Sequence, residues 1–144
     1  MPPSDRACVV DSHTWAWHAT GDDRRVGRSA RRVLAHTTVA YVPAICQWEI
    51  AMRIDAGRIR SDRPIGEWLE QAGATAPFRI APLTAEIAAA SVELGAEGFH
   101  GDPADRMIYA TARVLDLPLL TADATIRDFD RALPKARGRR VIWD

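Results

Sequence analysis

The chain has 144 residues, 47% of them hydrophobic, which suits a single domain with a substantial core. Nineteen basic and nineteen acidic side chains cancel, so any binding to nucleic acid must rest on local basic patches. No apolar run approaches the roughly 18 residues of a membrane span, and the N-terminus lacks a leader pattern. We therefore expect one cytoplasmic domain, residues 1–144, whose Cys8 and Cys46 are reduced and buried.

Short apolar runs alternate with helical patterns from the N-terminus onwards. In chain order, the sequence predicts a strand over 7–10, a helix over 22–36, a strand over 39–44, helices over 44–57 and 65–74, a strand over 78–83, helices over 84–97 and 103–115, and strands over 117–123 and 141–143. The strands are continuous apolar runs rather than alternating ones. This pattern predicts an α/β fold with a parallel sheet covered by helices on both faces.

Four carboxylates are embedded in these apolar segments or end them: Asp11, Glu49, Asp105 and Asp123. Asp11 and Asp123 follow strands, where parallel sheets collect their ligands. Two carboxylates 4 Å apart repel by roughly 4 kcal/mol at an effective dielectric constant near 20. Four acids in one place therefore need a divalent cation or shared protons. Oxygen ligands without thiolates indicate Mg²⁺ or Mn²⁺.

Each acid also has an ordinary structural explanation. Asp11 and Asp123 could cap the helices that follow them, and Asp102, which precedes a proline, is as well explained by capping as by metal binding. Glu49 could pair with Arg53 one helical turn later. Arg106 could pair with a neighbouring acid or meet a phosphate. The coincidence of several acids at one sheet edge is what favours a site.

Other common sites are not indicated. No glycine-rich phosphate loop follows the first strand, and the histidines lack zinc-binding spacing. The tryptophans are expected in the core or an interface. The arginines of 24–32 fit the polar side of an amphipathic helix. The basic candidates for RNA contact are Arg53, Arg58, Arg60 and Arg63, of which the last three are favoured, and Lys135, Arg137, Arg139 and Arg140.

The motifs around the acids carry a family resemblance. The sequence reads VVDSHTWAW, ICQWEIAMRIDAGRI, HGDPADRMIYATA, LPLLTAD and a terminal VIW, in that order over essentially the whole chain. This series resembles the PIN-domain ribonucleases, and within them the VapC-type toxins of toxin–antitoxin pairs. Ser12 and Thr14 stand where a threonine and an aliphatic residue are usual.

The resemblance implies a three-layer α/β/α sandwich and a metal-dependent endoribonuclease. It assigns metal binding and catalysis to Asp11, Glu49, Asp105 and Asp123, with Asp102 as an additional acid that is either a ligand or a helix cap. Thr121, Arg106 and Ser12 are expected in supporting or substrate-binding roles. It also implies one or two Mg²⁺ or Mn²⁺ ions, products with 5′-phosphate and 3′-hydroxyl ends, a homodimer, and a cognate antitoxin protein.

Two other functions remain open from the sequence. A phospho-acceptor signalling module would need paired acids near the first strand and a lysine after a later one, and Lys135 does not follow an obvious strand. A catalytically inactive RNA-binding module of the same fold would be expected to have lost some of the acids. All four acids are present, which favours the nuclease.

Overall fold

The computed structural model describes residues 6–135 and 138–144. Its five strands are β1 Ala7–Val10, β2 Val39–Pro43, β3 Phe78–Ala81, β4 Leu119–Leu120 and β5 Val141–Ile142. Its α-helices are α1 Ser12–Ala19, α2 Arg28–His36, α3 Ile45–Asp55, α4 Ile65–Ala74, α5 Ala85–Glu93, α6 Pro103–Leu115 and α7 Ala124–Ala132, with short 3₁₀ helices at Asp23–Arg25 and Leu94–Glu97.

All four pairings in the sheet are parallel, and the strand order is β3-β2-β1-β4-β5. The chain builds outward from β1 to β3 on one side and then returns to place β4 on the other side of β1. The strand order therefore reverses between β1 and β4. The carboxyl ends of strands at such a reversal border the crevice in which α/β proteins bind ligands. This arrangement confirms the predicted α/β fold and parallel sheet.

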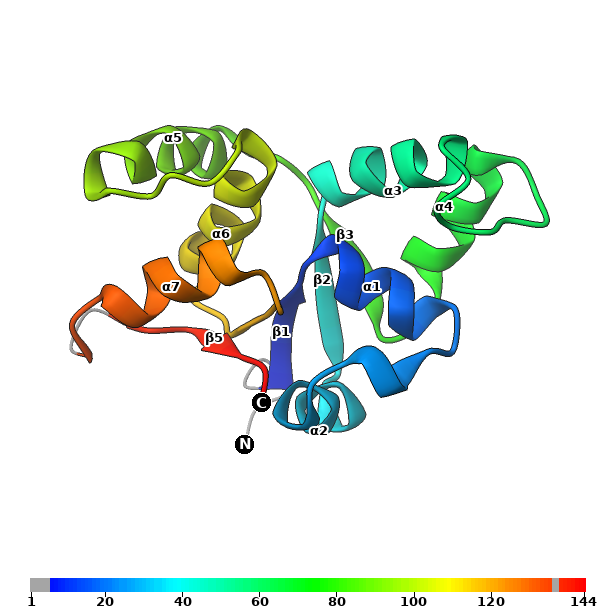
Figure 1. Cartoon of the computed structure of the whole chain (residues 1–144), viewed down its shortest axis with the longest axis horizontal. Coiled ribbons are helices and arrows are strands. Elements are labelled where there is room, and N and C mark those ends of the chain that lie inside the picture. The colour runs from blue at the N-terminus through cyan, green and yellow to red at the C-terminus, as the bar shows by residue number, and fades with distance from the viewer. Residues whose placement is uncertain (1–5, 136–137) are drawn as a thin grey trace.

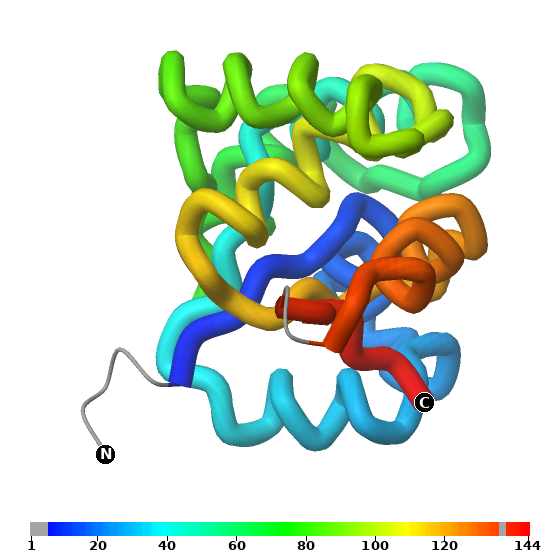
Figure 2. Tube along the Cα trace, turned by 90° about the vertical axis from the view of Figure 1, so that its left-hand side faces the viewer, coloured from blue at the N-terminus to red at the C-terminus, as the bar shows by residue number. Residues whose placement is uncertain are grey.

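Helices cover the sheet on both sides (Figure 1). The group α1, α3 and α4 lies on one side, and α5, α6 and α7 lie on the other. Figures 1 and 2 both place α2 at the opposite end of the molecule from α5, near the amino ends of β1 and β2. The opposite, carboxyl ends of these strands point toward α3 and α6. The candidate acids lie at that end.

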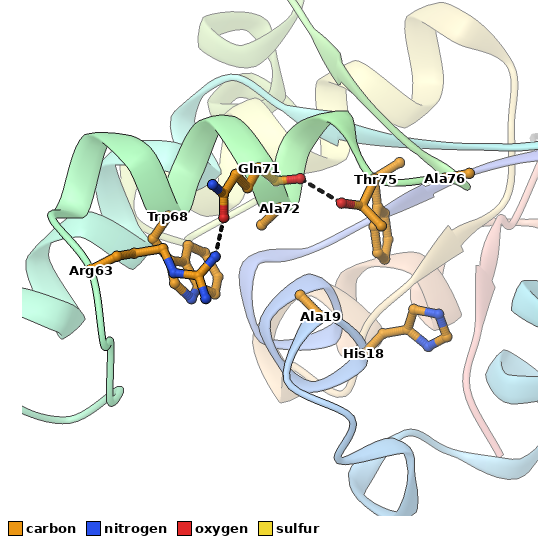
Figure 3. Close-up of a pocket in the computed structure, with 9 residues that line it drawn as sticks. His18, Ala19, Arg63, Trp68, Gln71, Ala72, Thr75 and Ala76 are labelled. Carbon is orange, nitrogen blue, oxygen red and sulfur yellow. Dashed lines mark hydrogen bonds between the residues drawn. The ribbon is translucent and has the colours of Figure 1, made fainter.

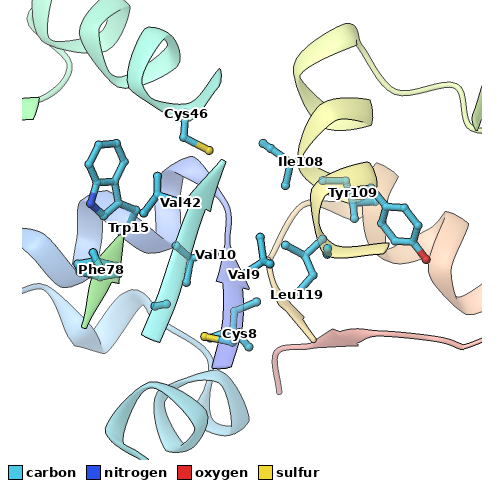
Figure 4. Packing of buried hydrophobic residues seen from close by; sticks show 14 of the residues in the cluster. Cys8, Val9, Val10, Trp15, Val42, Cys46, Phe78, Ile108, Tyr109 and Leu119 are labelled. Carbon is cyan, nitrogen blue, oxygen red and sulfur yellow. The ribbon is translucent and has the colours of Figure 1, made fainter. Parts of the chain in front are cut away.

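The core is built on the central strands (Figure 4). Cys8, Val9 and Val10 of β1 are fully buried, and Trp15 of α1 and Tyr109 of α6 pack on opposite sides of the sheet. Continuous burial along β1 explains its uninterrupted apolar sequence, because helices cover both of its faces. Both cysteines are free and buried, as predicted, and burial raises the pKa of the Cys8 thiol to about 11.

A buried carboxylate attaches the last strand to the helices. Asp130 of α7 accepts hydrogen bonds from the Tyr109 hydroxyl (2.8 Å) and from the backbone N–H groups of Arg140 (2.9 Å) and Val141 (3.1 Å). The side chain of Arg140 donates in turn to the Ala112 and Leu117 carbonyls. These bonds fix β5, which has only two residues, against α6 and α7.

Some predicted boundaries differ from the structure. The helix expected over 22–36 is interrupted at Val26 and Gly27, whose ψ angles of 132° and 154° are not helical. A side chain at Gly27 is excluded, because its Cβ would lie 2.2 Å from the Trp143 carbonyl oxygen. Helix α1 was considered only as a helix that Asp11 could cap, without bounds, and the last strands are shorter than expected. Helix α4 over 65–74 and helix α6 over 103–115 agree with the prediction.

Gly57 lies just after the end of α3 and stops the helix, as the sequence indicates. It has a φ of +75°, which glycine adopts without steric cost, and its N–H donates to the Ile54 carbonyl. The loop that follows carries Arg58, Ile59 and Arg60. Among the described residues, no helix is long and apolar enough to cross a membrane.

Candidate active site

A buried threonine joins the carboxyl ends of β1 and β4. The Thr121 hydroxyl donates to Oδ2 of Asp11 and accepts the backbone N–H of Asp123 at 3.0 Å. The other oxygen of Asp11 accepts the Thr14 N–H at 2.9 Å, which makes Asp11 the N-cap of α1. Asp11 is only 5% exposed. These bonds hold two of the candidate acids in fixed positions at the strand-order reversal.

A second hydroxyl links α1 to α3. The Ser12 Oγ donates to Oε1 of Glu49 at 2.6 Å, and Ser12 is itself buried. The alternative pairing of Glu49 with Arg53 is not formed, since no ion pair joins these two side chains in the described parts of the chain. The Glu49 side chain is half-buried and contacts Ser12 of α1 rather than Arg53 of its own helix.

The two acids at the start of α6, Asp102 and Asp105, have different surroundings. Asp102 is exposed and caps the helix, with Oδ1 accepting the Asp105 N–H at 2.8 Å and Pro103 following it. This is the capping alternative of the sequence analysis. Asp105 lies one turn further in and is half-buried, and a hydrogen bond from the Asp102 backbone lowers the pKa of its carboxyl.

The pKa of Asp105 is raised by burial and by neighbouring acids. Its pKa is raised from 3.8 to about 7, first by burial and then by the negative charges of Asp123, Asp102 and Glu49, in that order. These acids come from α7, the α6 cap and α3. Glu49, Asp102 and Asp123 are therefore near enough to Asp105 for their charges to affect it, whereas Asp11 is not among the causes.

Asp123 also combines two roles. Its Oδ2 accepts the Ile126 N–H at 3.1 Å and so caps α7. A carboxylate oxygen has two lone pairs, so one capping bond leaves capacity for a further contact. Capping thus explains how Asp11, Asp102 and Asp123 are positioned, and it does not prevent them from binding an ion.

The donor chemistry of this site suits a hard cation. Its carboxylate oxygens are oriented by the Ser12 and Thr121 hydroxyls, and the nearby thiol of Cys46 is buried, with its pKa raised well above the usual range by burial. Within residues 6–135 and 138–144, no three His, Cys, Asp or Glu side chains are close enough to hold one ion directly. Mg²⁺ keeps several of its waters when bound to carboxylates, so this wider spacing is compatible with it.

Arg106 does not pair with an acid. Its Nε donates to the Gly101 carbonyl at 3.1 Å, which braces the turn before α6. No carboxylate lies within ion-pair distance of it among the described residues. Of the two alternatives for Arg106, the pairing with an acid is not formed in this structure, and the contact with substrate phosphate stays a prediction.

The sequence analysis missed how Gly101 supports Asp105. Gly101 is buried, and a Cβ there would lie 2.3 Å from a ring carbon of Phe99 and 3.0 Å from the Asp105 Cβ. The missing side chain lets the fully buried Phe99 ring pack beneath the acid. A glycine directly before the acidic pair was the available signal, but only the packing shows why it is needed.

Of the three favoured basic residues, Arg58 and Arg60 line one groove and Arg63 lines another. Arg58 and Arg60 line a groove with Trp17 and Arg53, whereas Arg63 lines a different hollow between α1 and α4 (Figure 3). Arg63 pairs with Asp62 at 2.8 Å and donates to Gln71. None of the candidate acids lines that hollow. Arg137 lies outside the described residues.

The tryptophans divide between the core and the surface. Trp15 and Trp68 are buried and lie edge to face, with ring centroids 5.7 Å apart. Trp48 is 58% exposed, and Met52, one turn later on α3, is 50% exposed. Both border a groove that Glu49 and Asp102 also line. An exposed apolar pair beside acids suits an interface.

Comparisons with known proteins identify relatives of this chain and of its fold. The chain is 32% identical over 126 residues to Ribonuclease VapC22 of Mycobacterium tuberculosis, a match that covers 88% of this chain and 94% of that protein. A structure described as a toxin-antitoxin complex from Klebsiella pneumoniae has the same fold, with a TM-score of 0.59, 20% identity, and coverage of 94% of this chain and 95% of that one.

The family model described as PIN domain matches residues 8–132, a span that includes every candidate acid from Asp11 to Asp123. The resemblance inferred from the motifs is thereby confirmed at the level of the family. The chain belongs to the PIN domain family.

Proposed function

We propose that this protein is a Mg²⁺- or Mn²⁺-dependent endoribonuclease that acts as the toxin of a toxin–antitoxin pair. The observation that carries the proposal is the set of carboxylates at the strand-order reversal, where Thr121 holds Asp11 and Ser12 holds Glu49; the raised pKa of Asp105 supports it. Perturbed acids clustered in a crevice are typical of catalytic sites. The similarity to a ribonuclease supports RNA as the substrate.

Asp11, Glu49, Asp105 and Asp123 would hold the ion, directly or through water, and Asp102 would act chiefly as the helix cap. When bound, the ion supplies an activated water and stabilises negative charge on the scissile phosphodiester. Ser12 and Thr121 keep Glu49 and Asp11 in place, so that little reorganisation is needed when substrate arrives. To hold the ion, Asp105 would have to be ionised, because a ligand carboxylate binds in its charged form.

Partners follow from the same family. We propose a homodimer and an antitoxin that covers the acidic crevice, consistent with the exposed Trp48 and Met52 beside Glu49. The match to a toxin-antitoxin complex supports the antitoxin. We place the protein in the cytoplasm, where RNA is available and where free buried thiols such as Cys8 stay reduced.

The test uses purified protein, stripped of metal with a chelator and then supplied with Mg²⁺ or Mn²⁺, acting on total cellular RNA. We expect cleavage by the wild type only when metal is present, and loss of cleavage in Asp105→Asn and Glu49→Gln. The matched control is Asp128→Asn, which removes an exposed acid of α7 outside the site. Thermal unfolding shows whether each variant is folded.

The rival function is a PIN-fold module that binds RNA without cutting it. It predicts that wild-type protein retains RNA but leaves it intact at every metal concentration. Cleavage that continues unchanged in folded Asp105→Asn protein would also reject the proposed mechanism.

A further inference from the structure

A groove of about 570 Å³ lies next to the acids, between α1, the turn after it, and the loop that follows α3. Its volume is within the roughly 300–1,000 Å³ range of ligand sites. Its floor is formed by Ala16, the half-buried Trp17 and Ile59. We call it the Arg–Trp groove; its polar lining consists of His13, Thr20, Asp22, Arg25, Arg53, Arg58 and Arg60.

The Arg–Trp groove is strongly positive. Its one acid, Asp22, is paired with Arg25 at 3.4 Å. The three other arginines, Arg53, Arg58 and Arg60, have no carboxylate within 4 Å among the described residues. Arginines gathered in a concave site without neutralising partners attract a polyanion, and their planar guanidinium groups match phosphate oxygens. This local charge stands out in a chain whose net charge is zero.

The groove also offers an aromatic surface. The Trp17 ring lies 5.4 Å from the His13 ring and 6.2 Å from that of Trp143, and the Arg25 guanidinium lies 5.7 Å from its centroid. These neighbours fix the orientation of Trp17 while leaving it part of the groove lining. A fixed aromatic ring among arginines is the arrangement on which unpaired bases stack, with the arginines holding the phosphates.

The Arg–Trp groove is continuous with the acids. Arg53 and Arg58 also line the neighbouring groove, which contains Glu49 and Asp102. Arg53 is one helical turn, about 6 Å along the axis, from Glu49. His13 directly follows Ser12, whose hydroxyl holds Glu49. A strand lying in the Arg–Trp groove would therefore lead straight into the acidic site.

We propose that the Arg–Trp groove binds an unpaired nucleotide of the RNA strand that the proposed nuclease cuts, close to the scissile phosphodiester. The base stacks on Trp17, and Arg58 and Arg60 hold the adjoining phosphates. The inference rests on the proposed function for the identity of the strand. It also predicts a preference for single-stranded over double-stranded RNA, because a paired base cannot reach Trp17 without leaving its stack.

Binding is measured separately from cleavage. A fluorescent single-stranded RNA of about eight nucleotides is titrated with protein in a chelator, and its anisotropy is followed at several salt concentrations. Loss of two phosphate contacts in Arg58→Gln/Arg60→Gln should reduce the slope of log affinity against log salt by about 1.4. The matched control Arg79→Gln/Arg131→Gln removes two exposed arginines that do not line the groove, and its slope should equal that of the wild type.

The stacking contact is tested by a pair of variants. Trp17→Ala should weaken binding by about 5- to 150-fold, the equivalent of one stacked base, and Trp17→Phe should recover most of that loss. Because Trp17 also contacts Trp143, thermal unfolding is recorded for both variants. The double arginine variant changes only exposed side chains and keeps the test decisive if Trp17→Ala does not fold.

Equal salt slopes and equal affinities in the groove variants and the control would overturn the inference. It would also be overturned if an acidic, leucine-containing peptide bound the groove in a manner sensitive to Arg58 and Arg60 while RNA binding was not, because the groove would then serve a protein partner. If the wild-type protein cuts RNA and the groove variants bind RNA as tightly as it does, the proposed function stands and the groove proposal fails. If the groove variants bind RNA more weakly but the wild-type protein does not cut RNA, the groove proposal stands and the proposed function fails.

Discussion

Replacing Asp105 by asparagine should stabilise the metal-free protein while abolishing its activity. The folded-state pKa of this carboxyl is raised from 3.8 to about 7 by burial and by neighbouring acids. For an acid shifted upward, the folded state prefers the protonated form. Its favourable contribution is complete below pH 4 and is lost as the pH rises through about 7. Asparagine resembles the protonated form and cannot ionise.

The size of the effect follows from the shift. Three pKa units correspond to about 4 kcal/mol at full ionisation. Asp105 is only half-buried, so water and salt screen its repulsion. We therefore expect Asp105→Asn to exceed the wild type by roughly 1–2 kcal/mol at pH 8, or about 2–8 °C in Tm for a chain of this size. Near pH 4 the two should be nearly equal.

The assay is thermal unfolding in a chelator from pH 4 to 8, with Asp128→Asn as the control for loss of an exposed acid. The difference in Tm between Asp105→Asn and the wild type should open between about pH 4 and pH 7 and stay nearly constant above pH 7. Adding Mg²⁺ at pH 8 should stabilise the wild type and have little effect on the variant. Parallel curves for the two proteins at every pH would refute the claim that acids converge on Asp105.

Three further variants test contacts that support the site and the fold. Ser12→Ala releases the glutamate on α3 and should raise the metal concentration for half-maximal cleavage about 10- to 100-fold; an unchanged metal requirement, as expected for the control Ser91→Ala, would contradict this. Tyr109→Phe removes a buried hydrogen bond and should cost about 1–3 kcal/mol in urea unfolding without changing metal dependence; unaltered stability would show that the bond is dispensable. Gly101→Ala should lower the free energy of unfolding by about 1–3 kcal/mol, because the new methyl group overlaps the buried Phe99 ring. Gly66→Ala, in open space on α4, should not lower it. Equal melting temperatures for the two variants would contradict this explanation.

Much of the fold could be predicted because its signals are local. Continuous apolar strands, Gly57 after α3 and Pro103 at the start of α6 each act within a few residues. Helix α1 gave a weaker signal, because two of its four buried residues, Ser12 and Thr14, are polar. The exclusion of a side chain at Gly27 depends on Trp143, more than a hundred residues away, which no local pattern reveals.

The candidate site divides in the same way. The acids could be named because a carboxylate in an apolar segment is conspicuous in the sequence. Their connections could not be named, since the bonds from Thr121 to Asp11 and from Ser12 to Glu49 span 110 and 37 positions. The different surroundings of Arg60 and Arg63, three residues apart in one loop, likewise depend on how that loop folds against α1 and α4.

The central claim, that these acids support cleavage of RNA by metal-activated water, is tested most directly by the chemical ends of the products. An end-labelled RNA is cut by the purified protein with Mg²⁺, and the new 5′ ends are tested for phosphate. Attack by water at phosphorus with release of the 3′ oxygen leaves a 5′-phosphate and a 3′-hydroxyl, and we predict these ends only when metal is present. Products with 5′-hydroxyl ends, formed equally well in a chelator, would contradict the account, because the 2′-hydroxyl of the RNA rather than water would then be the nucleophile.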